Sequence, residues 1–95
     1  MMQYRTSVKI IADVLCTARD NNTEGNGVGI TTLLRKGNLS YSRMTKLLLE
    51  LIGSGLLLEL KAERVSRYKI SPKGIEFLFA YSHFSEFTES FGLRL

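Results

Sequence analysis

The sequence has few of the residues that hold very small or extracellular proteins together: it contains one cysteine, one histidine, one proline and no tryptophan in 95 residues. A single cysteine excludes a disulfide within the chain, and one cysteine with one histidine supplies too few ligands for a tetrahedral zinc site. No apolar run approaches the roughly 18 residues of a membrane span, and the N-terminus lacks the hydrophobic segment of a signal peptide. We therefore expect a cytoplasmic protein with no metal, no cofactor and no membrane partner.

The composition is that of an ordinary globular domain. Hydrophobic residues make up 44% of the chain and charged residues 23%, a balance that excludes disordered and fibrous chains. A chain of this length fits one domain, and it is long enough to bury a core without disulfides. We therefore expect residues 1–95 to form a single domain.

Basic and aromatic residues occupy different parts of the chain, whose formal net charge is +4. Residues 37–73 hold seven basic and three acidic side chains, whereas residues 74–95 hold one basic and three acidic. All five phenylalanines fall between residues 77 and 91. This division predicts two surfaces: a basic one in the middle of the chain, suited to a polyanion, and an aromatic one near the C-terminus.

Hydrophobic periodicity predicts four helices, because apolar residues recur with the three- and four-residue spacing of one buried helical face. Ser40 is a good N-cap for the third helix, and Ser71 followed by Pro72 marks the start of the fourth. The predicted helices cover residues 5–21, about 31–36, 41–54 and about 72–91.

Apolar and polar residues alternate with a period of two over residues 56–61 and 67–70, which predicts two strands. Residues 28–30 are expected to form a third, very short strand. The connection over residues 62–66 contains no Gly, Pro or Asn, so we expect a loose loop there and not a tight two-residue turn.

The predicted order is helix, short strand, helix, helix, strand, strand, helix. A short helix, a tight turn and an amphipathic helix form a helix-turn-helix, and two antiparallel strands directly after it form a β-wing. The sequence therefore predicts a winged helix-turn-helix, a mainly α fold with a small antiparallel β-wing. The helix-turn-helix covers about residues 30–54 and the wing about 56–70, and the last helix, about 72–91, is available for dimerisation.

The third helix is the candidate DNA-binding helix, because the second helix of a helix-turn-helix enters the major groove by its N-terminal residues. Arg43 and Lys46 supply charge there, and hydroxyl groups can bond bases or phosphates. The helix has no Asn or Gln to read adenine, so we expect weak or shape-based sequence preference. The candidate DNA contacts are Ser40, Tyr41, Ser42, Arg43, Thr45 and Lys46 in this helix, Arg35 and Lys36 before it, and Lys61, Arg64, Arg67 and Lys69 in the wing. The alternative is that these residues are a solvated helix face and a hairpin that its charges keep soluble.

The last helix is expected to carry two apolar faces. The face with Ile75, Leu78 and Phe79 becomes polar after two turns, and we expect it to pack on the domain core. Phenylalanines exposed on a protruding helix promote aggregation, so we expect the opposite face to bind the same helix of a second copy in a two-fold homodimer. This predicted dimer face consists of Phe77, Ala80, Tyr81, Phe84, Phe87, Thr88 and Phe91. The alternative is that the helix folds back and these rings fill a single core.

No catalytic constellation recurs around His83, and Gly25, Gly27 and Gly29 lack the spacing of a phosphate-binding loop. Neither an enzyme nor a small-molecule ligand is therefore expected. The first functional hypothesis is a homodimeric protein that binds double-stranded DNA, either as a transcriptional regulator or as an architectural chromatin-type protein of low sequence specificity. The second is a protein-interaction module that uses the winged fold as a scaffold and does not bind DNA.

Two segments of the sequence resemble a known family. Residues 37–41 read Gly-Asn-Leu-Ser-Tyr and are followed by Leu-Leu-Leu-Glu-Leu at residues 47–51 and Gly-Leu-Leu at residues 55–57. Residues 68–74 read Tyr-Lys-Ile-Ser-Pro-Lys-Gly and precede Phe77 and Leu78. Over about residues 5–82 the chain resembles the archaeal winged helix-turn-helix family of small basic DNA-binding proteins, which includes chromatin-associated proteins and predicted transcriptional regulators. The resemblance implies duplex DNA as the ligand and a dimer joined by an antiparallel coiled coil of the C-terminal helices.

Overall fold

The computed structural model describes residues 7–93, which form four helices and three strands. The observed order matches the prediction for a winged helix-turn-helix, and the predicted start of the first helix at residue 5 lies outside the described residues. In chain order the elements are α1 (Ser7–Asp20), β1 (Val28–Gly29), α2 (Ile30–Gly37), α3 (Tyr41–Gly53), β2 (Leu57–Ala62), β3 (Val65–Ile70) and α4 (Pro72–Glu89). No helix in this part of the chain is long and apolar enough to cross a membrane.

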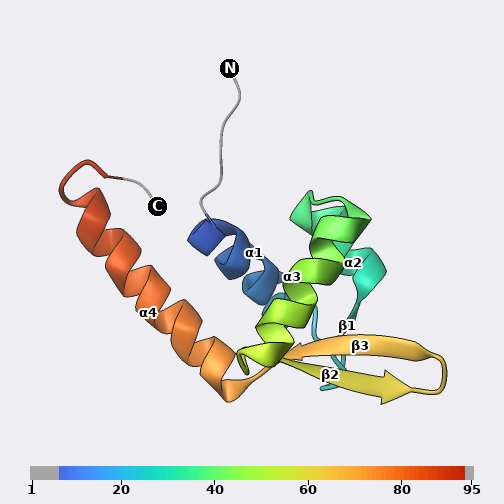
Figure 1. The fold of residues 1–95 in the computed structure, drawn as a ribbon. Coiled ribbons are helices and arrows are strands. Elements are labelled where there is room, and N and C mark those ends of the chain that lie inside the picture. The colour runs from blue at the N-terminus through green and yellow to red at the C-terminus, as the bar shows by residue number, and fades with distance from the viewer. Residues whose placement is uncertain (1–6, 94–95) are drawn as a thin grey trace.

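The three strands form one small antiparallel sheet in the order β1-β3-β2. Val28 of β1 is opposite Tyr68 of β3, and Leu57 of β2 is opposite Ile70 of β3. The hairpin of β2 and β3 projects from the base of the domain as the wing (Figure 1). Gly27 leads the chain into β1 with φ +75°, and a Cβ atom there would lie 2.7 Å from the Tyr68 carbonyl oxygen. Only glycine therefore allows β1 to approach β3.

The core lies between the first three helices and the inner face of the sheet. Each large apolar side chain that is removed from water there contributes about 1.5–3 kcal/mol. The fully buried large side chains are Val14, Leu15, Leu33, Met44, Leu48, Leu51 and Leu57. All but Leu57 occupy the apolar positions of the predicted helical periodicity. Leu57 is on the side of its strand that the alternation grouped with Glu59 and Lys61, while Leu58 is exposed, so the predicted apolar side of this strand is wrong.

Ser71 fixes the direction in which α4 leaves the sheet. Its buried hydroxyl donates a hydrogen bond to the Gly55 carbonyl oxygen at 2.6 Å and accepts one from the Gly74 amide at 2.9 Å. Gly74 has no space for a side chain, because a Cβ atom would clash with the Leu56 carbonyl oxygen and with the Ile70 side chain. The predicted N-cap is thus confirmed, and the same serine also ties α4 to the loop after α3.

The connection in the wing is a tight two-residue turn, so the predicted loose loop over residues 62–66 is wrong. Ala62 pairs with Val65, which leaves only Glu63 and Arg64 to reverse the chain. Glu63 adopts a left-handed conformation with φ 56°. Cross-strand pairing therefore extends to the end of both strands although the turn contains none of the residues that favour this geometry.

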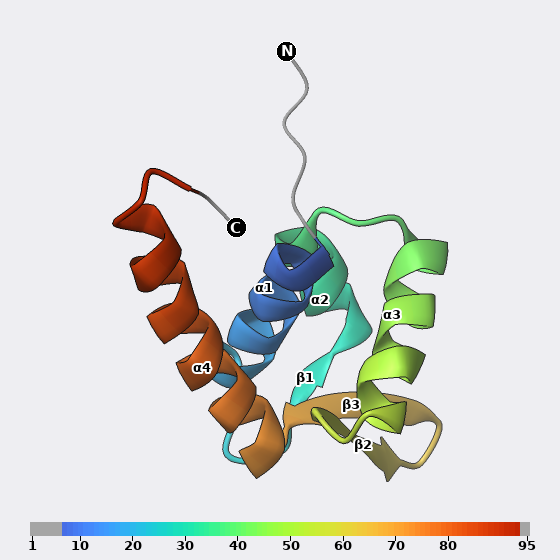
Figure 2. The same cartoon turned by 60° about the vertical axis from the view of Figure 1, so that its left-hand side comes forward.

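The fourth helix lies on the side of α1 opposite α3, and its C-terminal half projects from the domain (Figures 1 and 2). Leu78 is buried as predicted, but Ile75 and Phe79 are exposed, so that part of the predicted core-facing side is wrong. The side that packs toward the core instead includes Phe77 and Tyr81, which are half-buried against it. The packed face is thus rotated by about a quarter-turn from the predicted one.

Candidate nucleic-acid interface

The N-terminus of α3 is built by a tight turn and a side-chain cap. Asn38 takes the left-handed conformation that ends α2, and Ser40 Oγ accepts a hydrogen bond from the Arg43 amide at 3.3 Å. Gly37 is buried against Met44, whose Cε would lie 2.8 Å from a Cβ atom at that position. The first turn of α3 is exposed, so the N-terminal end of the helix, with the positive end of its dipole, is open to solvent.

One face of α3 is open to solvent along its length. Ser42, Thr45, Lys46 and Leu49 follow the spacing i, i+3, i+4 and i+7 and therefore share this face. Ser42 and Lys46 are exposed, and Thr45 is half-buried with its hydroxyl donating to the Ser42 carbonyl oxygen at 3.0 Å. Arg43 is exposed on the flank of the same face. The structure thus brings Ser42, Arg43, Thr45 and Lys46 together on one surface, with Ser40 and an exposed Tyr41 at its N-terminal end.

Leu49 belongs to this face, although it is not among the predicted site residues. Its side chain is 70% exposed, which makes it the most exposed large apolar side chain in residues 7–93. The sequence signal that places Leu49 on this face is its helical spacing from Ser42, Thr45 and Lys46. The buried leucines around it in the sequence obscure that signal, because a run of leucines suggests core packing.

The wing divides its predicted cations between two faces of the sheet. Side chains alternate across a strand, so Lys61 shares the inner face with Leu57 and Glu59, and Arg64 lies in the turn. Glu59 accepts a hydrogen bond from the Ser66 hydroxyl at 2.7 Å, so this carboxylate is held by a neutral partner on the opposite strand. Lys61 and Arg64 are both exposed. The exposed Glu63 lies beside them in the turn, so the end of the wing carries two cations and one carboxylate.

Arg67 and Lys69 lie on the outer face of the wing, turned toward the loop before β1. Arg67 donates from Nε to the Asn26 carbonyl oxygen and from Nη2 to the Gly27 carbonyl oxygen, both at 2.9 Å. Lys69 is half-buried, and its Nζ lies near Gly25 in the same loop. Arg67 therefore has a structural partner on the backbone, and these two cations are separated from the α3 surface.

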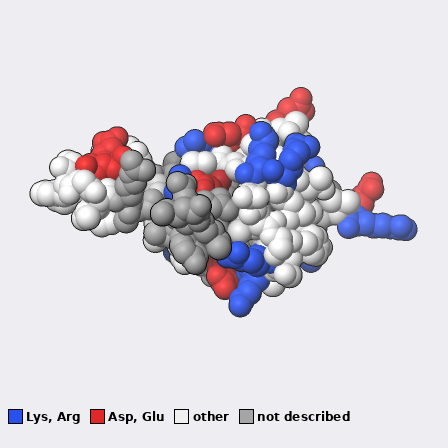
Figure 3. All heavy atoms as spheres, turned by 90° about the horizontal axis from the view of Figure 1, so that it is seen from above, with Lys and Arg blue, Asp and Glu red and all other residues white. Residues whose placement is uncertain are grey.

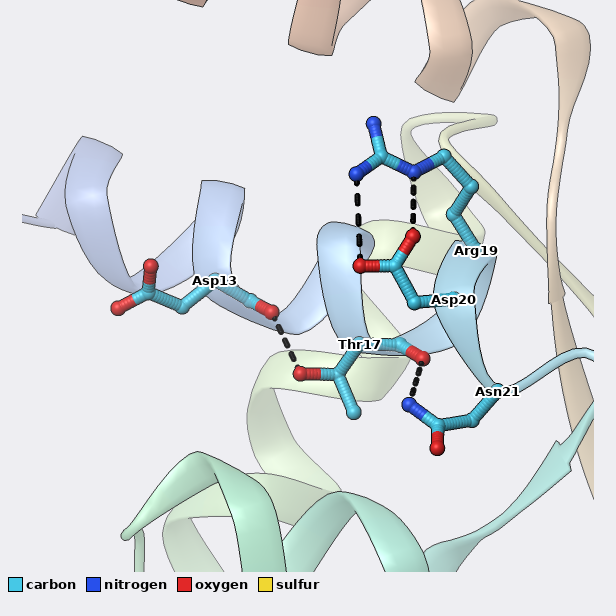
Figure 4. A network of polar contacts seen from close by, with 5 residues as sticks. All are labelled: Asp13, Thr17, Arg19, Asp20 and Asn21. Carbon is cyan, nitrogen blue, oxygen red and sulfur yellow. Dashed lines mark hydrogen bonds and ion pairs between the residues drawn. The ribbon is translucent and has the colours of Figure 1, made fainter.

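Two cations of α1 are paired with neighbouring carboxylates. At the end of α1, Arg19 donates to Asp20 from Nε at 2.8 Å and from Nη2 at 3.4 Å (Figure 4). This pairing lowers the pKa of Asp20 and raises the pKa of Arg19. Lys9 is likewise paired with Asp13 at 3.1 Å, which raises the pKa of Lys9. Within residues 7–93, by contrast, Arg43, Lys46, Lys61 and Arg64 form no ion pair, so their charge faces solvent.

The two predicted cations of α2 have different surroundings. Arg35 and Lys36 are both exposed in the last turn of the helix. Lys36 lines an open groove between α1 and α2 together with Asp13 and Asp20. Its charge is therefore close to two carboxylates, whereas Arg35 is not part of that groove.

Figure 3 shows Lys and Arg side chains over the winged part of the molecule, while the projecting arm shows acidic and uncharged side chains. That arm is α4, whose only described cation is Lys73 in its first turn. The charge division predicted from the sequence is thus also a division in space, between the winged part and the arm.

The arm carries an uncovered aromatic stripe. Ala80, Phe84 and Phe87 share one flank of α4, and Phe91 follows in the turn after the helix; the three phenylalanines are each more than half exposed. The Phe87 and Phe91 rings pack against each other at an interplanar angle of 58°, with their centroids 5.1 Å apart. The other members of the predicted dimer face, Phe77, Tyr81 and Thr88, turn toward the protomer itself, where Thr88 is buried. The structure therefore divides the predicted face into an inward half and an exposed half.

Comparison with known proteins gives a family and a fold. A family model described as winged helix-turn-helix matches residues 4–89. Among solved structures, the chain is similar to Sso10a-2, a DNA-binding protein from Sulfolobus solfataricus, with a TM-score of 0.76 and 22% sequence identity over 92% of this chain and 85% of that one. No curated protein matches the sequence.

Proposed function

The chain belongs to the winged helix-turn-helix family, and on that premise we propose that it is a homodimeric protein, one domain per chain, that binds double-stranded DNA. The observation that carries the proposal is the exposed face of α3, where Ser42, Arg43 and Lys46 project from the N-terminal half of the helix without carboxylate partners in the described part of the chain. Helices in this position of the fold enter the major groove by that end.

The positions of these charges suit an extended polyanion better than a small acidic patch on another protein. Arg43 and Lys46 lie on α3, and Lys61 and Arg64 lie at the end of the wing, so the cations are distributed over two elements that reach a duplex separately. Cations that contact phosphates supply affinity and its salt dependence. Arg67 contributes less to this affinity in our proposal, because its guanidinium is bonded to backbone carbonyls.

The experiment compares two double variants by duplex-binding titration. Arg43→Ala with Lys46→Ala removes two free cations from α3, and Lys9→Ala with Arg19→Ala removes two ion-paired cations from α1. Both double variants lower the net charge equally. We expect the α3 variant to lose affinity and to reduce the salt slope by about 0.9 for each phosphate contact that is lost. Equal affinity of the two variants would remove α3 from the interface.

The dimer rests on the exposed half of the aromatic face of α4. Phe84 and Phe87 lie on one flank of α4 and Phe91 in the turn after it, all three exposed, and a contiguous apolar surface of this kind marks a protein contact. A two-fold pairing of α4 with the same helix of a second copy covers these rings in both chains. It also doubles the number of DNA-facing cations in the binding unit.

Within this proposal we favour a transcriptional regulator or an architectural DNA-binding protein over an enzyme. His83 is paired with the Phe79 ring on the exposed side of α4, at a centroid distance of 4.4 Å, and Cys16 is half-buried on α1. No group of three His, Cys, Asp or Glu side chains in residues 7–93 is arranged to hold a metal. Selection of binding sites from a random duplex pool distinguishes the two roles, because a regulator enriches one sequence and an architectural protein does not.

A further inference from the structure

Leu49 occupies an unusual place for a leucine. It lies on the solvent-facing side of α3, seven residues after Ser42 and three after Lys46, and it is 70% exposed. The next turn of the same side ends at Gly53, where no atom lies within 4 Å of an added Cβ. Leu49 is not packed against the core, unlike Leu47 and Leu48 beside it. Most of the side chain is therefore open to solvent.

The surroundings of Leu49 fit a nucleic acid. Lys46 precedes it by one turn on the same face, and Arg43 lies on the flank, so an occupant of this face meets two free cations first. The exposed aromatic stripe is on α4, which lies on the far side of α1 (Figures 1 and 2). Leu49 is therefore an isolated apolar group within a polar surface that carries the exposed charges of Arg43, Lys46 and Glu50.

The major groove contains one apolar group that matches such a side chain, the C5-methyl group of thymine. Resting on the proposed DNA-binding function, we infer that Leu49 is a specificity-determining residue that contacts a thymine methyl when α3 lies in the major groove. Ser42 and Leu49 are about 10 Å apart along the helix axis, which is comparable to the groove width of about 12 Å. The helix thus reaches phosphate and base edges with its N-terminal half and a methyl group with its third turn.

This contact gives the protein a preference for one base that its polar residues cannot provide. Hydroxyl groups at Ser42 and Thr45 accept or donate to several bases, whereas a methyl contact distinguishes thymine from cytosine. It also favours DNA over RNA, because uracil lacks the methyl group and the major groove of an RNA duplex is too narrow for a helix.

The test uses two short duplexes of identical alternating sequence, one of deoxyadenosine and thymidine and the other with deoxyuridine in place of thymidine. The substitution removes only the methyl group. We expect wild-type protein to bind the thymidine duplex about fourfold more tightly for each Leu49 that contacts a thymine methyl. This ratio is the change in affinity expected from burying one methyl group. Leu49→Ala is expected to bind both duplexes equally. The matched control is Leu58→Ala, another exposed leucine on the outer face of the wing, which is expected to keep the preference.

The outcomes separate this inference from the proposed function. Equal affinity of wild-type protein for the two duplexes would overturn the methyl contact while leaving DNA binding intact, and so would a preference that persists in Leu49→Ala. Absence of binding to either duplex at low salt would contradict the proposed function and this inference together.

Discussion

Phe84 on α4 is the residue whose replacement tests the proposed dimer most directly. Its side chain is 56% exposed in the protomer, which leaves roughly 110 Å² of a ring whose full surface is about 200 Å². At about 25 cal/mol per Å², covering this area contributes about 3 kcal/mol per ring. A two-fold dimer covers two such rings, so their combined contribution is about 6 kcal/mol.

We expect Phe84→Glu to abolish the dimer. Each 1.4 kcal/mol changes the dissociation constant about tenfold, so loss of this contribution moves a micromolar dimer beyond millimolar concentrations. Sedimentation of wild type and variant at tens of micromolar measures the difference. Ser82→Glu is the control, because it adds the same charge to an exposed position of α4 that lies off the aromatic stripe. A wild-type protein that sediments as a monomer, or a Phe84→Glu variant that remains dimeric, would refute the reasoning.

Three further predictions concern stability, measured as the free energy of unfolding in urea. Ser71→Ala loses the N-cap of α4 and leaves the Gly55 carbonyl oxygen without its hydroxyl donor, so we expect a destabilisation of about 1–3 kcal/mol. Glu63→Gly relieves the backbone strain of a left-handed, non-glycine residue in the wing turn, so we expect the free energy of unfolding to rise by up to about 1 kcal/mol. A clear loss of stability would contradict the strained turn. Arg67→Ala removes two hydrogen bonds to the loop before β1, so it should lower stability by about 1–3 kcal/mol and change the salt slope of DNA binding little.

The fold could be predicted from the sequence because its signals are local. The spacing of apolar residues identifies the helices, and the caps at Ser40 and Ser71 mark where two of them begin. Even the two-residue strand β1 is predicted, since its residues stand between a glycine-rich turn and a helix. Each of these signals depends on neighbouring residues and needs no knowledge of distant contacts.

Features that depend on distant contacts could not be predicted in this way. The orientation of α4 depends on packing against α1, which places Phe77 and Tyr81 inward, whereas periodicity alone does not fix which side of a helix meets the core. The hydrogen bonds of Arg67 go to carbonyl groups about forty residues earlier in the chain. No local pattern reveals that such a cation has a structural partner.

The central claim is that the free cations of α3 and the wing bind the phosphates of duplex DNA, and the measurement that tests it most directly is the affinity of the wild-type protein for a short duplex at a series of salt concentrations. If Arg43, Lys46, Lys61 and Arg64 each contact a phosphate, the logarithm of the association constant falls with the logarithm of salt with a slope of about −3.6 per protomer. A slope near zero, or no binding at the lowest salt concentration, would contradict the account.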